Sequence, residues 1–251
     1  MSHHDIYRTD LQAPKSFVGR HIPLLAEKLH KVEPTLPIVP VEPADDFPHE
    51  QQGEMSVEQW QFDFWSPDHD LGGWIHFAYD SASRSAWYVA ALLGAQRSLV
   101  LVVDPHIRIK RLSPYLEFRA EGIWAQHVCE TPLRHWTVGL EAFGVTLDEP
   151  EDAMGDQWGT RTAVGLDLEW EHAAEPEQRD TGFSQESLVN GEVLINDMSF
   201  NVSTTGARTR SWATTASTIG ALDGISIRVG QRVLEIQPNF AGQSWRGQVL
   251  E

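Results

Sequence analysis

The chain has 251 residues, with 36 acidic against 19 basic side chains and a formal net charge of -17. This balance argues against nucleic acid as a partner, because phosphates attract clustered Lys and Arg, and against docking on an anionic membrane surface. Aromatic residues make up 10% of the chain and charged residues 22%, a composition that provides enough apolar surface for one large β-domain or two small ones.

Cysteine content and terminal sequence bear on the compartment. Cys129 is the single cysteine, so no internal disulfide is expected, and the apolar stretch around it predicts a small buried hydrophobe more than a nucleophile. No apolar run approaches the roughly 20 residues of a membrane helix. The first ten residues lack the charged and apolar regions of a signal peptide. We therefore expect a cytoplasmic protein.

Residues 1–54 differ from the rest and are predicted to form an N-terminal arm with one short helix. The helix is expected from Ile22 to Lys31, where leucines recur at helical spacing. Prolines and acidic residues then prevent regular structure over much of residues 32–53. This stretch is either a linker or an extended arm laid on the domain, and the apolar side chains at 38, 39 and 41 favour the arm.

Between residues 55 and 176, short alternating stretches rich in aromatic residues follow one another, separated by Gly, Pro, Asp and Ser. This pattern is typical of an all-β sandwich or barrel. Eight strands can close into a barrel with room for one small ligand. We expect strands near residues 56–65, 72–80, 85–93, 97–104, 115–120, 122–130, 134–141 and 160–171.

The stretch from Glu171 to Gly182 predicts a domain boundary, because it combines charged residues with Pro and Gly. Six more short strands are expected beyond it, and we assign residues 183–251 to a second, truncated β domain. Alone, this segment would bury little surface. It is expected to form half of a second barrel or a sheet packed on the first.

Four stretches, taken in order, resemble a known family. This family is the two-domain, lipocalin-like group that includes carotenoid 1,2-hydratase (hydroxyneurosporene synthase), kievitone hydratase and certain fungal Diels–Alderases, and the chain is most similar to its uncharacterised actinobacterial members. The first stretch, Phe62–Asp80, looks like the first hairpin of these proteins, and the second, Cys129–Glu141, is similar to their Glu-x-Pro-x-Arg-x-Trp stretch. The third, Val164–Pro176, looks like the strand that ends their first domain. The fourth, Gly206–Ser217, is similar to their Gly-x-Arg-Asp-His-Ser-Trp-Gly segment.

The resemblance implies a lipocalin-like antiparallel barrel over residues 55–176 and a bulky apolar ligand bound within or between two barrels. Characterised members add water to the ligand, cyclise it or rearrange it without an organic cofactor. The chain departs from the last motif, since Thr209 and Arg210 stand where the relatives carry Asp-His. A neutral His exchanges protons near pH 7, whereas Arg stays charged, so the departure favours ligand binding without chemistry.

Two histidines in aromatic strands are candidate catalytic residues. His76 lies beside Trp74, and His127 lies near Trp124. Either could act as a general acid or base inside a cavity lined by these indoles, but a half-buried His with a backbone partner is the more frequent situation. Strand parity places Trp74 and His76 on one face, and Trp124 and His127 on opposite faces.

Arg208, Arg210 and Trp212 form a row on one face of a predicted strand. The two cations could polarise a ligand carbonyl or enolate, with Arg210 catalytic and the other two residues binding the ligand. They could equally stack on Trp and hold the two domains together. Buried charges would need partners, and Asp167 or Glu130 could supply them.

Two further groups are interpreted as structural. Glu130 and Arg134 are expected to form an ion pair at a strand turn. Asp167 and Glu169 lie on the wet face of an alternating strand, which predicts solvated carboxylates instead of an acid–base dyad. Neither a His-x-His nor a Cys-x-x-Cys stretch occurs, so we expect no metal, and the lack of phosphate-binding glycine motifs predicts no nucleotide cofactor.

These features and the resemblance together predict a cofactor-independent enzyme that hydrates, cyclises or isomerises a hydrophobic terpenoid, polyketide or steroid-like molecule in the barrel cavity. Two alternatives stay open. One is a protein that binds such a ligand without chemistry, and the other is a pseudoenzyme subunit completed by a partner chain. A homodimer is a further option.

Overall fold

In the computed structural model, nearly all regular structure is β-strand, which confirms the all-β class. The helix expected at Ile22–Lys31 lies outside the described residues. The helical elements among the described residues are two 3-10 turns, η1 (Pro43–Asp46) and η2 (Pro67–His69), and none of these residues forms a helix of the length and hydropathy that a membrane crossing requires. The structure describes residues 40–49, 57–81, 83–94, 97–109, 115–148, 158–179, 182–213, 225–229, 232–237 and 246–250.

The main structure is a single antiparallel sheet of 11 strands. The eight strands expected between residues 56 and 171 are present in it as β1 to β8, with ends shifted by a few residues. The sheet comprises β1 (Val57–Ser66), β2 (Leu71–Asp80), β3 (Ser85–Leu93), β4 (Val100–Arg108), β5 (Tyr115–Ala120), β6 (Ile123–Thr131), β7 (His135–Leu147), β8 (Gly159–His172), β9 (Glu177–Arg179), β10 (Gly182–Ile195) and β11 (Met198–Ala213).

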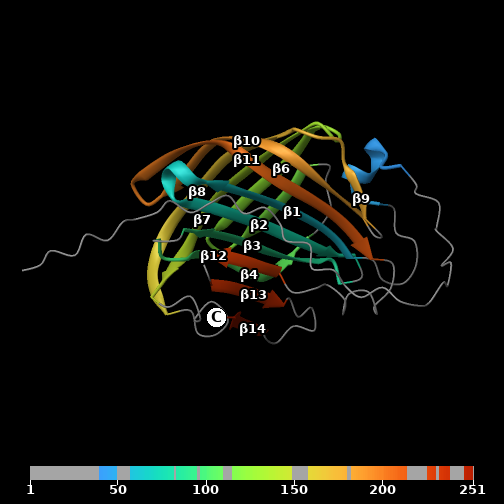
Figure 1. Cartoon of the computed structure of the whole chain (residues 1–251). Coiled ribbons are helices and arrows are strands. Elements are labelled where there is room, and N and C mark those ends of the chain that lie inside the picture. Colours follow the sequence, from blue (N-terminus) through green and yellow to red (C-terminus); the bar gives the residue numbers. More distant parts are fainter. Residues whose placement is uncertain are drawn as a thin grey trace, which may run out of the picture. The chain divides into compact units, whose positions relative to one another are not determined.

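The sheet curls until its two sides meet, as the curved strands of Figure 1 show. Its order is β4-β3-β2-β1-β11-β10-β8-β7-β6-β5, and β4 pairs in addition with the end of β7 through Val100 and Leu101. Strands β1–β4, β7, β8, β10 and β11 therefore form a closed ring. Gly144 makes this closure possible, because a Cβ at that position would lie 2.5 Å from the carbonyl oxygen of Leu101.

Large aromatic side chains fill much of the ring. On β5, β7 and β8 they alternate with polar residues, as expected for side chains on the inner face of a sheet. Burying one such side chain contributes about 1.5–3 kcal/mol. A second apolar cluster lies on the opposite face of β2 and β3, so both faces of these strands are buried. The inner cluster includes Trp60, Phe62, Phe64, Phe77, Tyr88, Phe118, Trp136 and Trp170.

Strands β10 and β11 belong to the same sheet, although the sequence pattern assigned residues 183–251 to a second domain. β11 pairs with β1 and β10 pairs with β8, so these two strands complete the ring. Without them, β1 and β8 would expose unpaired edges. The stretch at Glu171–Gly182, predicted to be a domain boundary, contains the short strand β9, which pairs with β10. The residues described between 198 and 213, where two strands were expected to begin, form one continuous strand.

The last described strands form a separate antiparallel sheet of three strands. It contains β12 (Ile225–Val229), β13 (Arg232–Gln237) and β14 (Arg246–Leu250), in that order. The residues beyond β11 that the structure describes all lie in these three strands.

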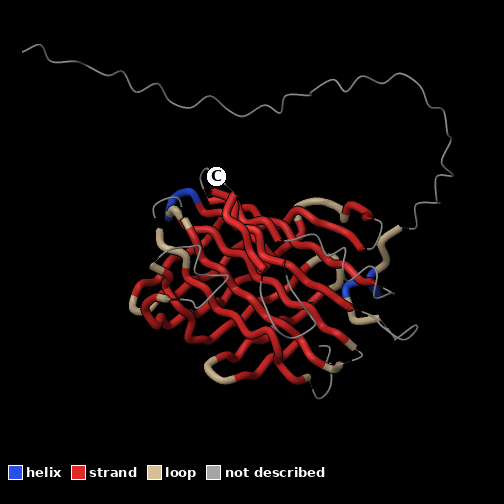
Figure 2. The backbone as a smooth tube through the Cα atoms, turned by 90° about the horizontal axis from the view of Figure 1, so that it is seen from below, coloured by secondary structure: helices blue, strands red, loops and turns tan. Residues whose placement is uncertain are grey.

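The end of the N-terminal arm lies on the ring. Residues 40–49 contain η1, in which Asp46 is fully buried, and the indole Nε1 of Trp60 donates to the Asp46 carbonyl at 3.4 Å. Residues 40–49 are therefore packed against the ring. Figures 1 and 2 place η1 and η2 at opposite ends of the ring, and we call these the arm end and the pocket end.

Candidate functional site

Arg208 and Arg210 project from β11 into the ring at the arm end. Both are almost fully buried, with 4% and 1% of their surface exposed. The guanidinium carbon of Arg210 lies 3.8 Å from the centre of the Trp60 ring, and that of Arg208 lies 5.0 Å from the centre of the Phe183 ring. The stacking of Arg on aromatic rings that the sequence suggested is therefore present.

Asp46 of the arm is the partner of Arg208. The two groups form a bidentate pair, with Nη1 donating to Oδ1 at 2.5 Å and Nη2 to Oδ2 at 3.2 Å. Asp46 also accepts the backbone N–H of Leu133, and Arg208 Nε donates to Gln185 Oε1 at 2.9 Å. The predicted partners were wrong, because Asp167 and Glu130 are exposed on the outer face.

Glu58 of β1 is the partner of Arg210, whose guanidinium also donates to the carbonyl oxygen of Phe47 at 3.0 Å. The Glu58 carboxylate lies 3.3 Å from Nδ1 of His49, and the His49 ring is 4.5 Å from that of Trp212. Burial acts to raise the pKa of Glu58, but the contacts with His49 and Arg210 outweigh it and hold this pKa below its ordinary value. The contact with Glu58 raises the pKa of His49.

These two ion pairs join three segments that are distant in sequence. They connect the arm, β1 and β11, and each guanidinium already has a buried carboxylate within contact distance. A buried charge that has lost its partner is strongly destabilising. The two pairs therefore hold the arm against β1 and β11, which gives Arg208 and Arg210 a structural role within one sheet and not between two domains.

His127 lies inside the ring among aromatic side chains. Its ring centroid is 5.1 Å from that of Phe77 and 5.7 Å from that of Tyr88, in stacked geometry. Neither ring nitrogen has a hydrogen-bond partner among the described residues. Burial lowers the pKa of His127 to about 3, so its imidazole is neutral at pH 7.

His76 and Trp74 face the other way, into the second apolar cluster. Their rings stack at a centroid distance of 5.2 Å, as strand parity predicts, and His76 Nε2 lies 3.1 Å from the amide oxygen of Gln59. Burial lowers the pKa of His76 to about 3. His76 and His127 therefore lie on opposite faces of one sheet, and one cavity cannot use both.

Trp124 lies on the outer face of β6, where its Nε1 donates to Glu117 at 3.3 Å. It is 39% exposed, so it is not part of the interior near His127. Cys129 is half-buried, and burial together with the charge of Asp46 raises its pKa to about 12, which fits the prediction that it is not a nucleophile.

The outer face of β7 and β8 carries the remaining charged candidates. Asp167 and Glu169 are exposed, as the alternation predicts. The expected pairing of Arg134 with Glu130 is replaced by contacts of Arg134 with His172 and Glu175, the latter at 3.5 Å.

A further group on this face was missed by motif searching. Ligand atoms of His135, Glu169 and Glu171 all lie within 4.8 Å of one another and could hold a metal ion. The register, which pairs His135 with Glu171, brings together residues that no sequence motif connects.

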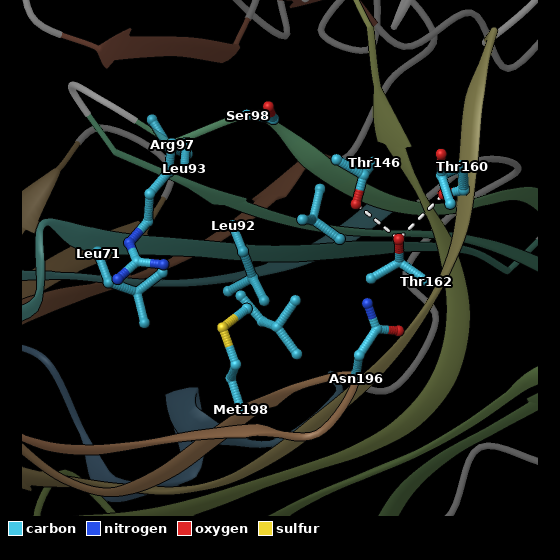
Figure 3. Close-up of a pocket in the computed structure, with 12 residues that line it drawn as sticks. Leu71, Leu92, Leu93, Arg97, Ser98, Thr146, Thr160, Thr162, Asn196 and Met198 are labelled. Carbon is cyan, nitrogen blue, oxygen red and sulfur yellow. Dashed lines mark hydrogen bonds between the residues drawn. The ribbon is translucent and has the colours of Figure 1, made fainter.

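A pocket of about 430 Å³ lies at the pocket end, where β2, β8 and β11 begin and β3, β7 and β10 end (Figure 3). Its apolar wall consists of Leu71, Leu92, Val100 and Ile195, which belong to the inner cluster. Its volume falls in the range of about 300–1,000 Å³ typical of small-molecule sites. None of the seven residues predicted for a site lines this pocket.

Hydroxyl groups line the opposite wall. Thr146 and Thr162 are hydrogen-bonded at 2.6 Å, and Thr162 donates to the carbonyl oxygen of Thr160 at 2.9 Å, as the dashed lines of Figure 3 show. Arg97 and Asn196 complete the polar rim. An apolar wall facing a few fixed polar groups is the usual composition of a ligand pocket. Because the lining residues come from strand ends that are distant in sequence, no local pattern identifies them.

A comparison with protein-family models gives the extent of the domain. A family model described as a domain of unknown function, DUF7064, matches residues 42–216, which run from the arm to the end of β11. No curated protein matches the sequence. A solved structure, titled "Crystal structure of CghA", is similar with a TM-score of 0.39 and 10% identity, over 85% of this chain and 63% of that chain. The chain thus spans less than two thirds of CghA. Because the family model matches most of its length, the chain belongs to the DUF7064 family.

Proposed function

We propose that this protein binds a hydrophobic small molecule in the pocket at the pocket end of the ring. The observation that carries the proposal is the pocket of about 430 Å³ with an apolar wall continuous with the ring interior and a hydroxyl-lined wall opposite. The sequence resemblance to lipocalin-like proteins that act on apolar molecules supports the same ligand class.

Binding without chemistry is the form of the proposal that the pocket favours. Hydration, cyclisation or isomerisation without a cofactor needs a group that transfers a proton. Among the described residues, those that line the pocket include no His, Asp, Glu, Cys or Tyr. The ion pairs at the arm end already engage Arg208 and Arg210, so these cations are not free to polarise a ligand.

The hydratase, cyclase or isomerase predicted from the sequence is the second candidate, and His127 supports it. A neutral imidazole that lies among aromatic rings, with no described residue as a partner for either nitrogen, could exchange a proton with a deeply inserted ligand. If so, a bound apolar substrate should be converted by the protein, and His127→Phe should abolish conversion while leaving ligand affinity unchanged. Conversion that survives this replacement would exclude His127 as the proton donor.

Titration with N-phenyl-1-naphthylamine, a neutral probe that fluoresces in apolar sites, tests the binding proposal. Met198→Trp should fill the pocket mouth, because Met198 lines the pocket and is 48% exposed. Leu188→Trp is the matched control, since Leu188 is 45% exposed on the outer face of β10 and lies outside the pocket.

We expect saturable probe binding by the parent protein and by the Leu188 variant, with affinity lowered about tenfold in the Met198 variant, which corresponds to about 1.4 kcal/mol. Equal binding by the two variants would place the probe elsewhere. No binding by the parent protein would refute the proposal.

A further inference from the structure

Among the described residues that line the pocket, Arg97 is the one charged side chain. The described part of the pocket wall is therefore formally cationic in a chain whose net charge is -17. We propose that the ligand is a hydrophobic carboxylate whose anionic group binds Arg97 while its apolar body lies on the leucine-rich wall. This inference rests on the proposed function and specifies its ligand class.

The Arg97 guanidinium is fixed in place by its neighbours. Nε and Nη2 donate to the carbonyl oxygen of His69, at 3.1 and 2.9 Å, and the guanidinium carbon lies 4.6 Å from the centre of the Phe200 ring. A donor group held in position before the ligand arrives loses little conformational entropy on binding. The carbonyl oxygen of His69 thus orients Arg97 through Nε and Nη2.

None of the residues that the structure describes accepts a hydrogen bond from the Nη1 group of Arg97. Among the described residues, no carboxylate lies within ion-pair distance of Arg97, whereas Arg208 and Arg210 each have one. Asp70 follows His69 in sequence, but it does not line the pocket. A carboxylate ligand would supply the missing counter-charge, and hydrogen bonds between a guanidinium and a carboxylate are among the strongest in proteins.

The rest of the pocket suits an amphiphile. Figure 3 shows Arg97 at one side, Thr146, Thr162 and Asn196 at the other, and Leu92 and Met198 between them. Asn196 accepts the N–H of Ala163 through Oδ1 at 3.0 Å, which leaves its amide NH₂ for a second polar group on the ligand. The apolar body would span the distance between these two polar sides.

Competition between decanoate and decan-1-ol tests this proposal, because the two molecules share a chain and differ in charge. Arg97→Gln removes the cation, and Arg97→Lys keeps the charge but loses the forked donor geometry. Arg161→Gln is the matched control, since the Arg161 guanidinium also lies over an aromatic ring, Phe143, at 3.9 Å, but outside the pocket.

Binding is measured for both molecules by displacement of N-phenyl-1-naphthylamine and directly by calorimetry. The parent protein and the Arg161 variant should prefer decanoate by about tenfold or more. Arg97→Gln should remove this preference by weakening decanoate alone, and Arg97→Lys should retain part of it. Circular dichroism confirms that each variant is folded.

The two proposals fail in different ways. The carboxylate proposal is overturned, and the hydrophobic pocket stands, in either of two cases. In the first, the probe and decan-1-ol bind but decanoate binds no more tightly than decan-1-ol. In the second, Arg97→Gln lowers the affinity for both molecules equally. If calorimetry detects neither molecule and the probe does not bind, both proposals are refuted.

Discussion

Replacing Asp46 with Ala tests whether the arm is an integral part of the folded domain. The Asp46 carboxylate is fully buried and accepts hydrogen bonds from Arg208, at 2.5 and 3.2 Å, and from the backbone of Leu133. Without it, Arg208 would keep its charge in a site with almost no access to water. Removing one partner of a buried pair costs about 3–5 kcal/mol, a large share of the roughly 5–15 kcal/mol by which a domain is stable.

Urea unfolding, followed by tryptophan fluorescence, measures this loss. Asp45→Ala is the control, because Asp45 lies in the same turn but is partly exposed and faces His49 at 3.4 Å, so its removal should cost less than about 1 kcal/mol. A double variant, Asp46→Leu with Arg208→Met, removes both charges and should recover most of the loss. Equal destabilisation by the two single alanine variants would refute the reasoning.

Three further predictions concern the closure of the ring and its histidines. Gly144→Ala should lower the unfolding free energy by about 1–3 kcal/mol, because the new Cβ would meet the Leu101 carbonyl where β4 joins β7. Gly139→Ala should be nearly neutral, because its Cβ would lie 3.4 Å from the Gln126 carbonyl oxygen, an ordinary contact. Urea midpoints of the two variants measure this difference. Because the pKa of His49 is raised in the folded protein, its contribution to stability is complete below pH about 6.5 and disappears as the pH rises through the folded-state pKa. His49→Gln should therefore reduce the fall in unfolding free energy between pH 6 and 8. Parallel curves for the parent protein and the variant would contradict this. Burial lowers the pKa of His127 to about 3, so the imidazole takes up a proton in the unfolded chain before it does so in the folded protein as the pH falls. His127→Phe should therefore remove up to about 1.4 kcal/mol of destabilisation per pH unit between pH 6 and 4. An unchanged slope of unfolding free energy against pH would show that the imidazole is not buried.

The strands could be predicted from sequence because their signals are local. Alternation along Val164–Trp170 and the turn residues between strands need no information about partners. Parity also placed Trp74 with His76, and separated Trp124 from His127, as the structure confirms.

Ring closure could not be predicted, because it depends on pairings between distant residues. Trp60 lies opposite Arg210, and Val100 lies opposite Thr146, and neither pair has a local signature. The partner of Arg208 was missed for the same reason, since Asp46 lies in a Pro-rich stretch without periodicity. The pocket residues occupy strand ends, so only the register of the whole ring brings them together.

The two ends of the ring differ in whether their arginines are already paired with a carboxylate among the described residues, and this difference decides where an anionic ligand can bind. At the arm end, a ligand carboxylate would have to displace Asp46 from Arg208 or Glu58 from Arg210, and the displaced carboxylate would lose its buried partner. At the pocket end, Arg97 donates to the neutral carbonyl of His69, and no described residue accepts a hydrogen bond from its Nη1 group. An anion that binds there would gain a charge-assisted contact and would break no ion pair between described residues. The Arg-x-Arg-x-Trp row is therefore the clearer pattern in the sequence, whereas Arg97 is the cation that a ligand can use.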